Sequence, residues 1–356
     1  MPDIRNWQDI DSSWLEDVLR NNGLETKIAD FSARPVGTGQ IGDCARFEIN
    51  YASAPDNAPS SLVGKFPSAG EESRNTARIL SNYFREVKFY QLLQSKAKIS
   101  TPFCYHADLN EETHDFVLIM EDLAPAEQGD QLEGSTLPQS ELVVKEAAKL
   151  HASYWNDETL DQYPWVSDTT NAPVALPPEA FADTWKGFVA RYGDRVTDRA
   201  RHIGDRLSVN LEAYGVKREG NRCLIHTDFR PDNMLFATSK GGKPVTIVDW
   251  QSFAYGAPAS DVGYFIAGAL DVDTRKANEE KLLDLYAVTL SELGAGEYPK
   301  DEMLRHYISG GYQLFLTAYF AAVMVTQTER GDKMFFRMLN GGVDLIYDHG
   351  AENWFD

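Results

Sequence analysis

The sequence contains little cysteine and no long apolar run. Its three cysteines, Cys44, Cys104 and Cys223, are widely separated and form no C-x-x-C pair. This spacing excludes a disulfide framework or a zinc site and indicates reduced cysteines in a cytoplasmic protein. The N-terminus lacks the apolar core of a signal peptide. The most apolar stretch, residues 314–325, is too short to span a bilayer, so we expect a buried helix there and no membrane insertion.

Basic residues are also scarce. Lys and Arg together number 34 against 54 Asp and Glu, which gives a formal net charge of −20. This balance argues against nucleic acid and anionic membranes as partners. It fits either a cationic ligand or an acidic surface that is simply solvated. The length of 356 residues leaves room for two lobes with a large core. The oligomeric state has no signature in the sequence.

A predicted β-hairpin carries the most informative polar residues. Short apolar runs at 234–236 and 245–248 flank a turn with two glycines. Because the strands are antiparallel, Asn233 and Asp249 are expected to meet at one end of the hairpin. Amide and carboxylate oxygens are ligands that suit Mg²⁺. Asp228 adds a second carboxylate on the incoming loop. The alternative is an ordinary surface hairpin with polar ends.

This spacing fits phosphoryl transfer, in which one Asp accepts a proton from the attacking hydroxyl while an Asn and a second Asp hold the metal. The segment H-T-D-F-R-P-D-N at 226–233 resembles the protein-kinase catalytic loop. Together with V-D-W-Q at 248–251, it is more similar to the aminoglycoside-phosphotransferase and ecdysteroid-kinase-like (choline-kinase-like) superfamily of small-molecule kinases. Thr227 stands where that family usually has glycine.

The resemblance implies roles for the residues of this segment. Asp228 would be the catalytic base, and Asn233 and Asp249 would bind Mg²⁺. Arg230 would either neutralise the transferred phosphoryl group or form a salt bridge with Asp232.

A G-x-G-x-x-G motif, formed by Gly37, Gly39 and Gly42, lies between predicted strands at 28–36 and 45–51. A dinucleotide-binding fold would continue into a helix instead. Glycines let backbone N–H groups approach phosphates closely, so the motif is a candidate ATP-binding flap. The alternative is a glycine hairpin without a ligand.

Lys65 lies on a third predicted strand, 62–66, which is otherwise mostly apolar. Such a lysine costs stability unless it meets an anion. The resemblance implies that it binds the phosphates of ATP and pairs with Glu86 of a predicted helix over 71–94; the alternative is a surface lysine.

Two further strands, 102–108 and 116–120, lead to a segment that resembles the hinge of the family. Backbone groups around Glu121 and Leu123 would hold the adenine. The Pro- and Gly-rich tract 124–134 is a predicted linker. We therefore predict an ATP-binding lobe of residues 1–122 and a catalytic, acceptor-binding lobe of residues 123–356.

The second lobe is predicted to be mostly helical. His151 is expected to be a hydrogen-bonded structural residue, and Asp261 either an N-cap or a tether for the catalytic loop. The aromatic residues of the later helices suit a core or an apolar acceptor pocket. The predicted helices cover 136–155, much of 175–214, 281–293, 301–329 and 334–347.

The expected fold is α+β and protein-kinase-like, with an antiparallel N-terminal sheet plus helix and a helical C-terminal lobe. Only nine residues separate Gln251 from Asp261, so a long activation loop and an A-P-E motif are absent. This favours a kinase that uses ATP and Mg²⁺ and phosphorylates a hydroxyl group of a small molecule. A non-catalytic nucleotide-binding pseudokinase and a kinase acting on a protein are the alternatives.

Overall fold

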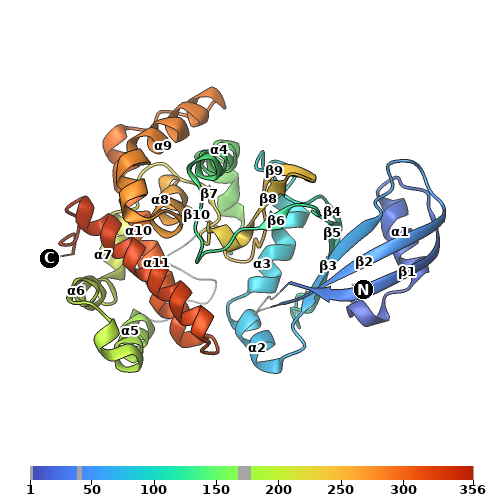
Figure 1. The fold of residues 1–356 in the computed structure, drawn as a ribbon, viewed down its shortest axis with the longest axis horizontal. Coiled ribbons are helices and arrows are strands. Elements are labelled where there is room, and N and C mark those ends of the chain that lie inside the picture. Colours follow the sequence, from blue (N-terminus) through green and yellow to red (C-terminus); the bar gives the residue numbers. More distant parts are fainter. Residues whose placement is uncertain (1–2, 38–41, 167–177, 356) are drawn as a thin grey trace. The chain divides into compact units, whose positions relative to one another are not determined.

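The computed structural model describes residues 3–37, 42–166 and 178–355. The chain divides into two compact units (Figure 1). The first comprises Met1–Lys96, Thr101–Pro125 and Val248–Ser252, and the second comprises Ala97–Ser100, Ala126–Ile247 and Phe253–Asp356. The assignment of ATP binding and of catalysis to lobes divided after residue 122 stays a prediction.

The first unit is built on an antiparallel five-stranded sheet in the order β1-β2-β3-β5-β4. Val36 pairs with Cys44, so β1 and β2 flank the glycine motif as the two arms of a hairpin. The strand that follows the glycines is therefore confirmed. The strands are β1 (Lys27–Val36), β2 (Gly42–Ser53), β3 (Ser61–Pro67), β4 (Cys104–Leu109) and β5 (Phe116–Glu121).

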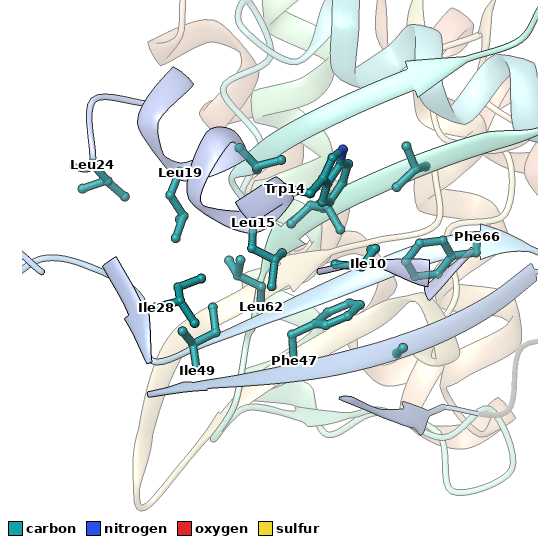
Figure 2. Close-up of a cluster of buried hydrophobic side chains, with 14 residues drawn as sticks. Ile10, Trp14, Leu15, Leu19, Leu24, Ile28, Phe47, Ile49, Leu62 and Phe66 are labelled. Carbon is teal, nitrogen blue, oxygen red and sulfur yellow. The ribbon is translucent and has the colours of Figure 1, made fainter. Parts of the chain in front are cut away.

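Helix α1 (Ser12–Asn21) covers one face of this sheet. It begins after Asp11, whose side chain accepts a hydrogen bond from the Trp14 N–H. Its apolar side chains pack against alternate strand residues, including Leu62 and Phe66 of β3 (Figure 2). Because strand residues alternate between faces, Lys65 lies on the opposite face of β3.

The opposite face carries α2 (Glu71–Ile79), α3 (Asn82–Lys88) and the π-helical turn η2 (Phe89–Leu93). The prediction of one continuous helix over 71–94 is wrong, because Ser81 adopts a left-handed φ of 54° and ends α2. Ile79, the last residue of α2, is 56% exposed. After the break, Tyr83 packs on Phe116 of β5, with ring centroids 4.6 Å apart.

The second unit is mainly helical and contains two small sheets. A capping box formed by Thr136 and Gln139 begins α4. The described part of the predicted helical region 175–214 forms three helices, and residues 175–177 lie outside the described residues. The helices are α4 (Leu137–Ser153), α5 (Pro178–Tyr192), α6 (Asp198–Leu207), α7 (Leu211–Val216), α8 (Ala259–Ala269), α9 (Val272–Glu292), α10 (Lys300–Met324) and α11 (Glu329–Asp348), with short 3₁₀ turns at Glu158–Gln162, Gly193–Arg195 and Pro231–Asn233.

The small sheets lie around the predicted catalytic segment. Strands β7 (Cys223–Ile225) and β10 (Ala254–Gly256) pair with each other. The predicted hairpin is formed by β8 (Met234–Thr238) and β9 (Gly241–Ile247). The tract 124–134 is not a free linker, because β6 (Glu127–Gln128) pairs with β8 as a third strand. The proline and glycine of this tract are typical of loops, so its sequence did not predict the short edge strand.

Helices α8 and α10 are in backbone contact where glycines face each other. A Cβ on Gly263 would lie 1.9 Å from the Tyr307 carbonyl oxygen, and one on Gly310 would lie 2.2 Å from that of Ser260. Only glycine permits this approach. All residues of α8 are buried as a result. Within the described part of the chain, no helix has the length and apolarity needed to cross a bilayer.

Candidate active site

The first candidate cluster surrounds Lys65, which lies on the α3-facing side of β3. Its Nζ is 2.7 Å from a carboxylate oxygen of Glu86 on α3 and 2.8 Å from Oδ1 of Asp249. The Glu86 side chain is only 2% exposed. The predicted pairing of Lys65 with Glu86 is therefore present in the structure, while nucleotide binding by these residues stays a prediction.

Charge and burial shift the pKa values of Lys65 and Glu86 in opposite directions. Burial disfavours the ammonium form of Lys65, but Asp249 and Glu86 outweigh it and raise the pKa of this lysine. Burial also raises the pKa of Glu86 to about 7, although Lys65 opposes the change. The cluster thus holds a firmly charged cation between two acids.

The segment that carries Asp249 is fastened to the helices of the first unit. Trp250 stacks on Phe89, with ring centroids 3.8 Å apart and planes 3° apart. The Trp250 backbone N–H donates to Glu86. Asn82 donates to the Gln251 carbonyl oxygen at 3.3 Å. These contacts fix the position of Asp249, whose Oδ1 also accepts a hydrogen bond from Gln251.

The glycines of the phosphate-flap motif differ in their surroundings. Gly37 has a left-handed φ of 77°. A Cβ on Gly42 would lie 3.1 Å from the Phe66 carbonyl oxygen and 3.5 Å from Cε of Lys65. A side chain there would therefore crowd the backbone of Phe66 and come into van der Waals contact with Lys65. Gly39 lies outside the described residues.

Glu121 and Leu123, the predicted adenine hinge, lie at and just after the end of β5. The backbone N–H of Phe103 donates to the Glu121 side chain at 3.0 Å, so this carboxylate holds the segment that precedes β4. Leu123 is half-buried. Adenine binding by backbone groups here stays a prediction.

The second candidate cluster surrounds Asp228, whose carboxylate accepts from three side chains. Tyr264 on α8 donates to Oδ1 at 2.8 Å, and Asn233 donates to Oδ2 at 2.8 Å. Nε of Arg230 lies 3.0 Å from Oδ1. The amide nitrogen of Asn233 therefore faces Asp228, which leaves its oxygen as the atom able to bind a cation.

Arg230 forms ion pairs with both Asp228 and Asp232. Burial opposes its charge, but the two carboxylates outweigh burial and raise its pKa. Nη1 also contacts Sδ of Met334 on α11 at 3.2 Å. Of the two predicted alternatives, the salt bridge with Asp232 is present.

Asp261 tethers the start of the predicted catalytic loop, residues 226–233. Its carboxylate is fully buried and accepts from the backbone N–H groups of His226 at 2.6 Å and Thr227 at 2.9 Å. Helix α8 has Pro258 at its N-cap, so Asp261 is a tether and not an N-cap. His151, predicted to be structural, is buried between Asp261 and the Tyr286 hydroxyl.

The register of the β8–β9 hairpin locates the two predicted metal ligands in the sequence relative to the end of the ladder. Met234 pairs with Ile247 at the end of the β8–β9 ladder. Asn233 immediately precedes this pair, and Asp249 follows it by two residues. Sharing of one cation by Asn233 and Asp249 stays a prediction. Among the residues that the structure describes, no group of three His, Cys, Asp or Glu side chains could hold a metal ion. Mg²⁺ needs only one or two protein oxygen ligands, because it keeps several waters and binds substrate phosphates.

Sequence reasoning missed Tyr264 and assigned no role to Trp250 and Gln251. Tyr264 lies three residues after Asp261 on one helix, so the two side chains share a face. That spacing could have identified Tyr264 as a neighbour of the catalytic loop. The Trp250–Phe89 stack has no comparable signal, because it joins segments 161 positions apart in the sequence.

The antiparallel sheet, the helical second unit and the two charged clusters define a kinase-like protein. A family model described as the ecdysteroid kinase-like family matches residues 39–295. The chain therefore belongs to the ecdysteroid kinase-like family. No curated protein sequence matches this chain.

Solved structures with low sequence identity share the fold. A candidate aminoglycoside phosphotransferase from Ralstonia eutropha is 14% identical, with 96% of this chain and 98% of that chain covered and a TM-score of 0.56. An aminoglycoside phosphotransferase solved with GDP and kanamycin is 15% identical, with 96% and 100% covered and a TM-score of 0.52. The choline kinase of Streptococcus pneumoniae is 12% identical, with 93% and 98% covered and a TM-score of 0.51.

Proposed function

We propose that this protein transfers the γ-phosphoryl group of ATP, with Mg²⁺, to a hydroxyl group of a small molecule. The observation that carries the proposal is the Lys65 ammonium held by Glu86 and Asp249 at 2.7–2.8 Å. A lysine paired with a helix glutamate and placed beside a metal-binding aspartate is the arrangement that phosphoryl transfer requires in kinases. Membership of the ecdysteroid kinase-like family supports the same reaction.

The residues divide into two tasks. Lys65 and the glycine motif would hold the phosphates of ATP, and Asn233 and Asp249 would hold Mg²⁺, which neutralises charge on the phosphoryl oxygens. Asp228 would orient the acceptor hydroxyl and accept its proton. Arg230 would neutralise charge next to Asp228. Its contact with the transferred phosphoryl group would require that it release one of its two carboxylate partners.

The reaction is tested with the Asp228→Asn variant. We expect turnover to fall by about 10²–10⁴, because a positioned general base contributes roughly that factor. Nucleotide affinity should remain unchanged. ATP consumption is measured over a panel of alcohols and amino alcohols, and mass spectrometry detects the added phosphoryl group. The matched control is Asp271→Asn, which changes an exposed N-cap of the same unit. Full turnover in Asp228→Asn with the identified acceptor would remove Asp228 from the reaction.

The metal is tested by nucleotide binding. We expect a non-hydrolysable ATP analogue to bind the wild-type protein more tightly with Mg²⁺ than with EDTA. Asp249→Asn should abolish this difference, whereas the control Asp115→Asn, at an exposed ion pair of the same unit, should preserve it. Equal Mg²⁺ dependence in Asp249→Asn would exclude Asp249 as the ligand. GDP is included as a competitor, because a structural neighbour was solved with it.

Two alternative functions give different results in these assays. A pseudokinase would bind nucleotide but would neither transfer its phosphoryl group to an alcohol nor hydrolyse it with water. A protein kinase would transfer radiolabel to proteins of a lysate in preference to the alcohol panel. The short connection from Gln251 to Asp261 favours a small-molecule acceptor over a protein.

A further inference from the structure

Tyr264 is the one aromatic hydroxyl seen to donate to Asp228 among the described residues of the second unit. Its side chain is 1% exposed, and its Oη lies 2.8 Å from Oδ1 of Asp228. The Thr317 hydroxyl on α10 faces the same phenolic oxygen as a donor. The phenol therefore has a partner on each side, and its proton points to the carboxylate.

The backbone supports this placement. Tyr264 lies one residue after Gly263, where α8 contacts the backbone of α10 closely. It lies three residues after Asp261, which tethers the catalytic loop by its backbone N–H groups. One helix therefore fixes both the backbone at the start of the loop and the side chain of Asp228. Burial on all sides prevents Tyr264 from moving away.

The three donors to Asp228 do not act alike. Arg230 lies close to both carboxylate oxygens, at 3.0 and 3.1 Å, so it does not select one orientation. Asn233 donates to Oδ2 and also to the Asp228 carbonyl oxygen at 2.8 Å. Among the described residues, Tyr264 is the one that approaches Oδ1 from a helix. Two hydrogen bonds from different directions, one on each oxygen, stop the carboxylate from rotating and leave its remaining lone pairs in defined directions.

We propose that Tyr264 is a positioning residue that sets the rotation of the Asp228 carboxylate and so directs its remaining lone pairs at the acceptor hydroxyl. This role rests on the proposed function, because it acts through Asp228. In this role Tyr264 contacts Asp228 and not ATP. Its loss should therefore slow turnover without weakening ATP binding.

The test uses phosphate release from Mg²⁺-ATP with water as the acceptor. We expect Tyr264→Phe to lower kcat about tenfold or more, because a hydrogen bond to a charged group is among the stronger ones in proteins. KM for ATP should change less than about twofold. The matched control is Tyr307→Phe, because Tyr307 is equally buried in the same unit and donates to Glu279 at 2.9 Å. A merely structural hydroxyl would lower kcat in both variants alike, and that result would overturn the proposal.

A double-mutant cycle separates this proposal from the proposed function. If Tyr264 acts through Asp228, Tyr264→Phe causes no further fall in kcat in the Asp228→Asn background. Multiplicative effects would overturn the positioning role and leave Asp228 as the base. Unchanged kcat in Asp228→Asn alone would overturn the proposed role of Asp228 instead.

A second measurement does not depend on turnover. Tyr264→Phe should lower the midpoint of urea unfolding more in the wild-type background than in the Asp228→Asn background, because the charged partner is present only in the former. Equal shifts in both backgrounds would show that the contact is not formed, which overturns the proposal. If the wild-type protein consumes no ATP with water or with the alcohol panel, the proposed function fails and the positioning role fails with it.

Discussion

The two charged clusters hold side chains of opposite charge. In the first unit two carboxylates, Glu86 and Asp249, hold the cation Lys65 in place. In the second unit three donor side chains hold the carboxylate of Asp228. One cluster fixes the position of a positive charge, and the other fixes the orientation of a negative one. A phosphoryl-transfer site needs both, because the phosphates need a fixed cation and the acceptor needs a directed base.

The two clusters also differ in backbone strain. Each contains a non-glycine residue in the left-handed region, with φ of 68° at Asp249 and 69° at Thr227. Aspartate tolerates this region, whereas a β-branched residue rarely adopts it. Thr227 is held by Asp261 at its N–H and by Gln313, which donates to its carbonyl oxygen at 2.9 Å. The predicted catalytic loop therefore depends on tertiary contacts to keep a strained conformation.

The largest expected effect comes from removing the cation of the first cluster. Lys65→Met leaves the buried Glu86 beside Asp249 without a counter-charge, and breaking a buried pair costs about 3–5 kcal/mol. We expect a fall of that size in the free energy of unfolding, measured by urea denaturation, together with loss of ATP-analogue binding. Lys27→Met, at an ion pair whose lysine is 69% exposed, should cost at most about 1 kcal/mol.

The double variant Lys65→Met/Glu86→Gln sharpens this prediction. Removing the second charge should restore part of the lost stability without restoring nucleotide binding. If the single variant is as stable as the wild-type protein, the cluster does not hold a buried charge pair. The comparison between a held cation in the first unit and a held carboxylate in the second would then be wrong.

A smaller effect is expected from Asp261→Asn in the second unit. The amide keeps one acceptor oxygen but places an NH₂ group against a backbone N–H, so one buried donor loses its partner. This costs about 1–3 kcal/mol. Turnover should fall as well, because the start of the catalytic loop is released. Urea denaturation and the phosphate-release assay measure the two effects, with Asp271→Asn again as the exposed control. Unchanged stability would show that Asp261 does not tether the loop.

The smallest effect, and the only gain, is expected from Thr227→Gly. Relief of the left-handed threonine is worth about 1–2 kcal/mol, and the extra freedom of glycine in the unfolded chain offsets about 0.4–1 kcal/mol of it. The free energy of unfolding should therefore rise by up to about 1.6 kcal/mol. Thr238→Gly, at the end of β8, should lower it. Destabilisation by Thr227→Gly would mean that the threonine side chain contributes more than its backbone strain costs.

Much of the fold could be predicted because local patterns reflect which face of an element is buried. The strands on both sides of the glycine motif and the hairpin at 234–247 follow from such patterns. The break at Ser81 and the strand Glu127–Gln128 were missed. A single left-handed residue leaves the surrounding periodicity intact, and a two-residue edge strand has no periodicity at all.

The candidate site divides in the same way. The sequence by itself determined which side chains are candidates for the chemistry: Asp228, Asn233 and Asp249 stand in motifs whose spacing is local, and Lys65 lies on a predicted strand. Only the tertiary structure decided that Asp249 contacts a lysine 184 positions away, and that Tyr264 reaches Asp228. The physical reason is that a contact between distant segments depends on how closely elements pack. That closeness arises from details such as the facing glycines of α8 and α10, which no periodic pattern encodes.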